Sequence, residues 1–117
     1  MNASAASAAR PSASYVEVCR LDAILPDTGV CALVGDAQIA IFRVGDRVYA
    51  LGNRDPCSGA AVLARGLVGD RGGVATVASP IFKQRFALAS GVCLDDPSVS
   101  VPTYACRVRD GVVEISA

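Results

Sequence analysis

The chain has 117 residues, of which 52% are hydrophobic, and its 11 basic and 11 acidic side chains leave no net charge. That length and hydrophobicity fit one domain that buries about two-thirds of the surface of the unfolded chain, and the balanced charge gives no general attraction to nucleic acid or anionic lipid. The longest apolar stretches, residues 38–44 and 60–64, are far shorter than the roughly 20 residues that span a bilayer, so we expect no membrane segment.

Residues 1–14 form a small and polar stretch without the charged start and apolar middle of a secretory signal. We interpret them as a disordered tail in front of a domain that covers residues 15–117. The cysteines are odd in number, and no two of them have the spacing of a metal-binding pair: Cys19, Cys31, Cys57, Cys93 and Cys106. This pattern favours reduced thiols in a cytoplasmic protein.

From Tyr15 onward, short β-rich runs alternate with turn residues, and no window holds an apolar period of 3.6 residues long enough for a substantial helix. We therefore predict an all-β domain. The predicted strands are Tyr15–Cys19, Val30–Val34, Gln38–Val44, Arg47–Leu51, Val74–Ala78, Phe86–Leu88, Tyr104–Arg109 and Val112–Ile115.

Two dipeptides predict tight hairpins between these strands. Gly45-Asp46 separates two apolar alternations, and Asp110-Gly111 supplies the left-handed conformers that a two-residue hairpin needs. The period-two rule then places a set of alternating residues in the core, together with Phe86. The set is Ile39, Ile41, Val48, Ala50, Val108 and Ile115.

Two irregular segments interrupt the strands. Residues 52–73 hold too many glycines for regular sheet and allow only one short helical turn, at Ala60–Ala64, while residues 79–85 form a second loop. Pro56 and Pro80 fit loop apices better than positions in a strand ladder. Because a compact domain seldom keeps so long a loop without a use, we expect the first loop to have a function. The two proline-containing loops look like a pair.

This order of hairpin, proline loop, strand, second proline loop and Phe-x-Leu-x-x-Gly (residues 86–91) resembles a Rieske domain over nearly all of residues 15–115. The resemblance implies a Rieske-like antiparallel β-sandwich or barrel with two ligand-type loops. In that family the loops present Cys-x-His and Cys-x-x-His to a two-iron cluster. The alignment puts Asp55 and Cys57 at the ligand positions of the first loop, and Ser79 and Phe82 at those of the second.

A chain without histidine cannot supply the two imidazoles of a Rieske centre. We therefore expect no metal ligand, no cofactor-binding residue and no catalytic residue in this chain. Asp55 has no carboxylate or histidine near it in the sequence, and an Asp before Pro more often shapes a turn than donates a proton. Cys57 is interpreted as a small apolar filler, with a reactive thiol beside Arg54 as the alternative.

Further motifs make the chain similar to the small subunits of assimilatory NAD(P)H-dependent nitrite reductases, which are Rieske-like domains without iron–sulfur ligands. These motifs are residues 39–43, 48–53, 64–70, 78–88 and 91–97. The resemblance implies a cytoplasmic complex with a large subunit that carries FAD, an iron–sulfur cluster and sirohaem. On this interpretation, NADH supplies electrons and nitrite becomes ammonium in the large subunit, while this chain binds it without catalysing a step.

Charge within the loops suggests where the large subunit binds. Residues 53–86 hold five basic and two acidic side chains, and the rest of the chain has the opposite excess. Such asymmetry orients a domain on an acidic partner surface, although a charged loop is often only solvated. Phe82 either plugs the vacated ligand site or serves as an exposed anchor. The candidate interface residues are Arg54, Arg65, Phe82, Lys83 and Arg85.

Two other functions stay open at this point. The same loops would suit a free-standing Rieske-like interaction module that serves another redox enzyme or a regulator without a cofactor. A ferredoxin-like electron carrier is the third possibility, and the missing histidines argue against it.

Overall fold

The computed structural model describes residues 15–116, so the predicted tail at residues 1–14 lies outside the described residues. Within the described part, the regular elements are strands and two short 3₁₀ turns, which confirms the all-β class. They are β1 (Tyr15–Arg20), η2 (Leu21–Ala23), β2 (Thr28–Val34), β3 (Ala37–Val44), β4 (Arg47–Gly52), η3 (Leu63–Arg65), β5 (Leu67–Arg71), β6 (Val74–Ala78), β7 (Arg85–Ala87), β8 (Thr103–Arg109) and β9 (Val112–Ser116).

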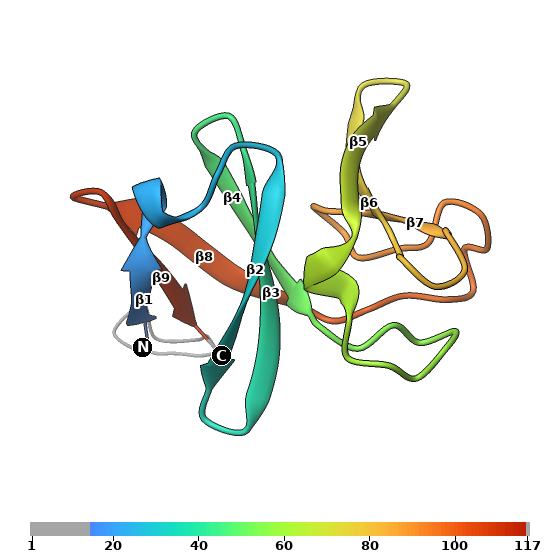
Figure 1. Ribbon diagram of the computed structural model, residues 1–117, viewed down its shortest axis with the longest axis horizontal. Helices are drawn as coiled ribbons and strands as arrows, with labels where there is room; N and C mark the ends of the chain where they lie inside the picture. Colours follow the sequence, from blue (N-terminus) through green and yellow to red (C-terminus); the bar gives the residue numbers. More distant parts are fainter. Residues whose placement is uncertain (1–14, 117) are drawn as a thin grey trace, which may run out of the picture.

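The strands form two antiparallel sheets. Six strands pair in the order β1-β9-β8-β4-β3-β2, and the other three pair as β5-β6-β7. The larger sheet curls upon itself on one side of the molecule, and the smaller sheet lies with the long loops on the other side (Figure 1). Among residues 15–116 there is no helix with the length and apolar character needed to cross a bilayer.

Strand β3 lies between two hydrophobic cores and contributes side chains to both. Its residues 39–42 are all fully buried because both faces of the strand are covered. Side chains alternate between the faces of a strand, so Ile39 and Ile41 enter the core inside the curl and Ala40 and Phe42 enter the other. The inner core also holds Ile24, Ala50, Val113 and Ile115. The outer core, between the curled sheet and the smaller sheet, also holds Leu51, Leu63, Val77, Phe86, Leu88, Cys93 and Val101.

Most of the predicted core is confirmed. Ile39, Ile41, Ala50, Phe86 and Ile115 are buried. Val48 is only partly buried and packs at the rim of the inner core. The prediction for Val108 is wrong, since it is 37% exposed. Val108 shares a face of β8 with two residues that do pack on the inner core, but it lies next to the hairpin turn, beyond the edge of that core.

All eight predicted strands are present, with ends shifted by at most two residues, but strand β5 was missed. Leu67–Arg71 falls inside the segment that was predicted to be irregular because of its glycines. Gly69 is tolerated in this strand because the Arg85 side chain lies over it, and an added Cβ would be 2.8 Å from the Arg85 Nη1 atom. The predicted helical turn at Ala60–Ala64 lies slightly further along the chain, as η3.

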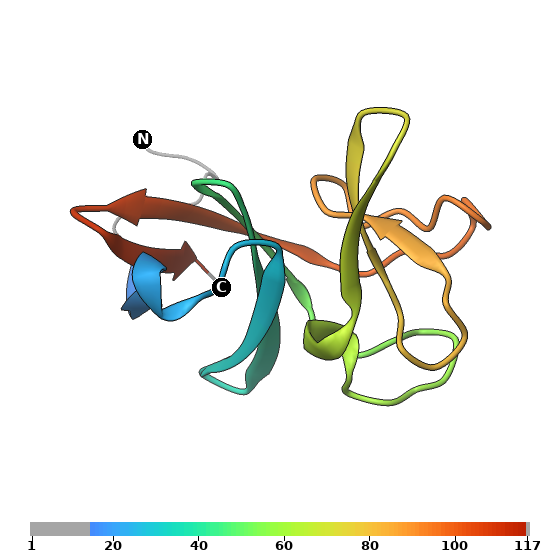
Figure 2. The same ribbon diagram turned by 45° about the horizontal axis from the view of Figure 1, so that its top comes forward.

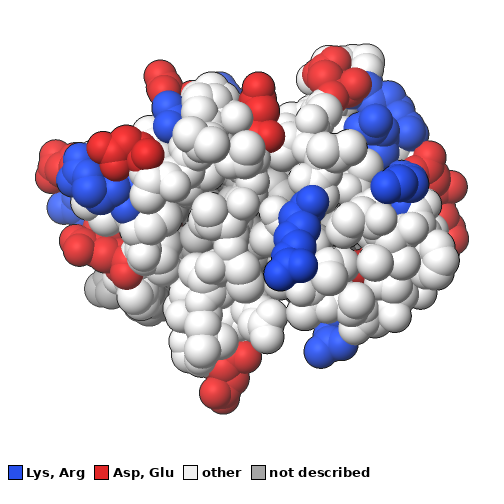
Figure 3. Space-filling view, in the orientation of Figure 1, with Lys and Arg blue, Asp and Glu red and all other residues white. Residues whose placement is uncertain are grey.

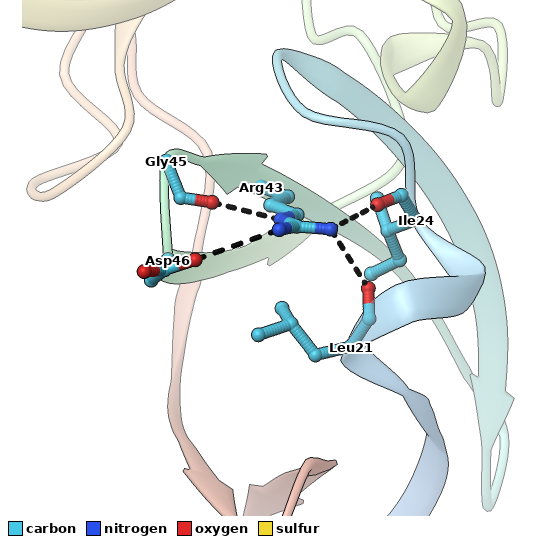
Figure 4. A network of polar contacts seen from close by, with 5 residues as sticks. All are labelled: Leu21, Ile24, Arg43, Gly45 and Asp46. Carbon is cyan, nitrogen blue, oxygen red and sulfur yellow. Dashed lines mark hydrogen bonds and ion pairs between the residues drawn. The ribbon is translucent and has the colours of Figure 1, made fainter.

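One arginine joins the segment around η2 to the β3–β4 hairpin (Figure 4). The Nη1 atom of Arg43 donates to the carbonyl oxygens of Ile24, at 2.9 Å, and Leu21, at 3.4 Å. The Nε atom of Arg43 donates to the Gly45 carbonyl at 2.8 Å, and its Nη2 atom pairs with Asp46 Oδ1 at 3.5 Å. The guanidinium thus donates hydrogen bonds to carbonyl oxygens of two separate turns and fixes the position of the chain just before β2.

Candidate interaction surface

The two predicted ligand-type loops are each closed by their own backbone hydrogen bonds. In the first loop, the amide of Asp55 donates to the Ala60 carbonyl at 2.8 Å, and that of Gly59 to the Asp55 carbonyl at 2.7 Å. In the second loop, the Lys83 amide donates to the Ser79 carbonyl at 3.0 Å. Figure 2 shows both loops in the lobe of the smaller sheet, away from the β1 and β9 strands. Both loops therefore lie on the same side of the molecule.

A buried hydrogen bond links the two loops. Asp55 and Ser79 are both fully buried, and the Ser79 hydroxyl donates to Asp55 Oδ2 at 2.5 Å. The other carboxylate oxygen of Asp55 accepts from the Cys57 amide at 2.8 Å, and the Ser79 Oγ atom accepts from the Ile81 amide at 3.3 Å. These are the two positions that the alignment places at the cysteine ligands. Protein groups therefore join the loops at the point where the family has its thiolate-bound iron.

The Asp55 carboxyl group is held in its ionised form. Burial raises its pKa, but hydrogen bonds from Ser79, from the amide of Cys57 and from Ser58 outweigh burial and hold the pKa below the ordinary value. An ionised carboxylate at neutral pH accepts hydrogen bonds and has no proton to donate. Asp55 is thus a structural acceptor, as expected from its place before a proline.

The two positions aligned with histidine ligands lie on the surface instead. Phe82 is 57% exposed, so its side chain does not plug the site, and its role as an anchor stays a prediction. Cys57 is also exposed, and its pKa is raised by desolvation and by the negative charges near it, Asp55 first. A raised pKa reduces the fraction of thiolate, so this environment does not activate the thiol.

The residues at the four ligand positions do not fit a Rieske cluster. They supply a carboxylate, a hydroxyl, a thiol and a phenyl ring, where the cluster needs two thiolates and two imidazoles. The carboxylate and the hydroxyl already bond to each other. Across residues 15–116, no three cysteine, aspartate or glutamate side chains gather in a way that could hold a metal ion.

The candidate interface residues lie in four places. Phe82 and Lys83 share the second loop with Ile81, which is 46% exposed, and the bonds at Asp55 and Ser79 bring Cys57 beside them. We call the surface of Cys57, Ile81, Phe82 and Lys83 the loop end. Arg54, in the first loop, bonds to the Gly59 carbonyl at 2.5 Å.

The remaining two arginines face elsewhere. Arg65 lies beside β2, where it lines a hollow with Cys31. Arg85 is half-buried, and its Nη1 atom donates to the Thr76 hydroxyl at 3.1 Å. The structure thus brings only part of the predicted set together.

One acidic residue from outside the basic segment, Asp95, neutralises part of its charge. Asp95 pairs with Arg71 at 3.2 Å and accepts from the Arg85 amide at 3.0 Å. These bonds lower the pKa of Asp95, so its charge is present at neutral pH. Red and blue atoms accordingly lie side by side on the lobe of the smaller sheet (Figure 3). Sequence reasoning missed Asp95 because it lies ten residues beyond Arg85, although it belongs to the motif at residues 91–97.

Comparison with known proteins agrees with this geometry. The family model of the Rieske-like [2Fe-2S] domain matches residues 14–116. The nitrite reductase (NADH) small subunit of Escherichia coli (strain K12) is 50% identical over 103 residues, which cover 86% of this chain and 95% of that protein. A crystal structure of an NADH-dependent nitrite reductase small subunit from Mycobacterium tuberculosis has a TM-score of 0.85 at 52% identity, and the match covers 88% of this chain and 94% of that chain.

A larger protein also contains a segment of this kind. In the nitrite reductase NAD(P)H large subunit of Klebsiella oxytoca, 105 residues are 46% identical to this chain, and they cover 90% of this chain and 11% of that protein. The fold, the family model and these relatives agree over almost all of the described residues. The chain therefore belongs to the Rieske-like domain family and, within it, to the small subunits of NADH-dependent nitrite reductase.

Proposed function

We propose that this chain is a non-catalytic subunit that docks on the large subunit of a cytoplasmic nitrite reductase through its loop end, and that it holds no cluster of its own. The hydrogen bond between Asp55 and Ser79 carries the proposal. It joins the two loops through protein side chains, and a fixed loop is a suitable recognition surface. FAD, an iron–sulfur cluster and sirohaem are then expected in the large subunit, where nitrite is reduced to ammonium.

The relatives support a lasting association with that subunit. One relative is named a small subunit, and the large-subunit protein of Klebsiella oxytoca contains a segment of this kind within its own chain. A domain that occurs both as a separate chain and as part of the longer one is expected to occupy a fixed place in the complex. No comparable observation favours a module for another enzyme or regulator.

The chemistry of the loop end defines the surface that it fits. Ile81 and Phe82 offer exposed apolar area, and Lys83 adds a cation beside them. Aromatic side chains that enter a pocket on the partner contribute most of the binding energy of many interfaces, while a rim charge mainly sets orientation and association rate. We therefore expect an apolar pocket on the large subunit with acidic residues at its edge.

Two variants test this surface. We expect Phe82→Ala to weaken association with the large subunit by roughly tenfold or more, because it removes the anchor. Lys83→Glu should slow association mainly at low salt. Leu25→Ala and Arg109→Glu are the matched controls, since Leu25 is 71% exposed and Arg109 is exposed beside the β8–β9 turn. Binding is measured by biosensor against the purified large subunit.

The outcome that contradicts the proposal is equally definite. Wild-type affinity in both loop-end variants would exclude this surface as the docking site, and a large subunit that fails to bind the wild-type chain would exclude the function itself. Iron analysis with a visible spectrum tests the cluster. Stoichiometric iron with the bands of a sulfide-bridged pair in the isolated chain would contradict a cluster-free subunit.

A further inference from the structure

The outer edge of β2 carries main-chain groups that bond to no strand of the described part. β2 ends the order of the six-stranded sheet and pairs only with β3. The two-residue turn that follows makes Val34 and Ala37 a hydrogen-bonded pair. Because such pairs alternate along an antiparallel ladder, the N–H and C=O groups of Gly29, Cys31 and Leu33 point away from β3. Within residues 15–116, no turn, loop or side-chain hydrogen bond reaches these three residues.

The side chains along this edge leave it open to another strand. Cys31 is exposed and Leu33 is 71% exposed, and β2 contains no charged residue, no proline and no bulge. Proteins normally protect a free edge with such features, because an unprotected edge pairs with other chains. An unprotected edge of seven residues is therefore suited to pair with a strand of a partner.

The opposite edge of the same sheet has the usual protection. β1 carries two charged residues, Glu17 and Arg20, and its pairing with β9 shifts register between Glu17 and Cys19. A charge and a bulge both discourage the addition of a strand. The two edges of one sheet thus differ, and only β2 is suited to extend it.

Charge at the two ends of β2 indicates the kind of segment that fits. Asp27 precedes the strand, Asp36 lies in the turn after it, and both are exposed. Figure 3 shows an uncharged surface over most of β2 with acidic atoms near its upper and lower ends. Arg54 lines a hollow with Asp36, but its guanidinium bonds to the Gly59 carbonyl. A complementary segment is therefore apolar in its middle and basic at both ends.

Acidic ends argue against a second copy of this chain as the occupant. In an antiparallel pair of two β2 strands centred on Cys31, Asp27 of one copy would approach Asp36 of the other at both ends. Like charges across a strand pair are destabilising. Beside the middle of the strand, Gly29 and Cys31 line a hollow of about 300 Å³ together with Arg65, so there is space next to this part of the edge.

We propose that β2 is a strand-addition site, and that an extended segment of the large subunit, apolar in its middle and basic at its ends, pairs with its open edge. This inference rests on the proposed function for the identity of the partner, but it concerns a surface separate from the loop end. Main-chain hydrogen bonds give such a site its affinity, and the alternate side chains, Cys31 and Leu33, give it specificity.

Amide hydrogen exchange tests the inference directly on the wild-type complex. The ¹⁵N-labelled chain is exchanged alone or bound to the large subunit, and it is then released into a slow-exchange solvent for residue-by-residue NMR. We expect exchange at Cys31 and Leu33 to slow at least tenfold in the complex, because their amides gain acceptors. Ala32 and Val34 already donate to β3 and serve as internal controls.

A matched pair of variants tests the same bonds. Cys31→Pro removes an outward N–H without breaking the ladder to β3, and Cys31→Ala keeps that N–H. We expect Cys31→Pro to weaken the complex at least tenfold, and Cys31→Ala to change it less than twofold. If Cys31→Pro lowers the melting temperature too far for use, Leu33→Lys replaces it, since a charge on an open edge also opposes strand addition.

The results separate this inference from the proposed function. One result would exclude strand addition and keep docking through the loop end. In that case Phe82→Ala weakens the complex, but the outward amides of β2 exchange in the complex as fast as in the isolated chain. Slow outward exchange in the isolated chain also overturns the inference. If the slow exchange is independent of protein concentration, residues of the same chain cover the edge. If the exchange becomes slower as the protein concentration rises, a second copy covers it. Absence of any complex overturns both proposals.

Discussion

Asp55 links the stability of the fold to pH. Its pKa in the folded chain is below the ordinary value, so its stabilising contribution is present above the unfolded pKa of about 4 and is lost as pH falls through the folded pKa. We expect Asp55→Asn to lower the free energy of unfolding at pH 7 by about 1–3 kcal/mol, since it weakens the buried bonds to Ser79 and Cys57. The difference from the wild type should shrink at pH 3.

Urea denaturation at the two pH values measures this effect. Asp36→Asn is the matched control, because Asp36 is exposed in a turn and its side chain makes no hydrogen bond within residues 15–116. Its free energy of unfolding should follow that of the wild type at both pH values. If Asp55→Asn lowers the free energy of unfolding by the same amount at pH 3 as at pH 7, the carboxylate charge is not what holds the two loops together.

At the scale of the element, the loop after β7 depends on a glycine for two independent reasons. Gly91 has a φ of +76°, and a Cβ added there would lie 2.2 Å from the Val101 carbonyl oxygen. The same loop is fixed by a hydrogen bond from the Val101 amide to the Gly91 carbonyl at 2.9 Å. This explains the last position of the Phe-x-Leu-x-x-Gly motif, where neither the backbone angle nor the space admits a side chain.

A pair of alanine variants separates these two reasons. Gly35, in the β2–β3 turn, has a φ of +60° but no atom within 4 Å of an added Cβ. Gly35→Ala should therefore cost only the left-handed strain, about 1–2 kcal/mol. We expect Gly91→Ala to cost about 1–3 kcal/mol more, because the backbone must also shift. Chemical denaturation compares the free energies of unfolding of the two variants. Equal losses would show that the loop backbone at Gly91 shifts to admit a side chain without a further loss of stability.

The elements that could be predicted from the sequence are those in which the local pattern and the packing agree. Alternating apolar residues such as Ile39 and Ile41 predicted the strands, and Asp110-Gly111 predicted a turn whose two residues do have positive φ values of 53° and 77°. Strand β5 could not be predicted in this way. The side chain that covers Gly69 comes from Arg85, which is distant in the sequence and becomes a neighbour only after folding.

The candidate site was predictable in position but not in detail. The prolines and the resemblance placed both loops, yet the bond between Asp55 and Ser79 joins residues 24 positions apart. Periodicity does not report such a contact, because it depends on how two loops meet. The exposure of Phe82 and the pairing of Asp95 with Arg71 depend on tertiary structure for the same reason. Local charge counting therefore overestimated the positive character of the loops.

At the scale of the whole molecule, the burial of β3 on both faces has a consequence for unfolding. A strand whose alternate residues fill two cores cannot leave one of them without exposing the other. The curled sheet and the loop-bearing lobe should therefore melt as one cooperative unit, although they look like separate lobes (Figure 1). Urea transitions followed by far-ultraviolet circular dichroism and by tyrosine fluorescence should coincide. Two separate midpoints would mean that each lobe keeps a stability of its own.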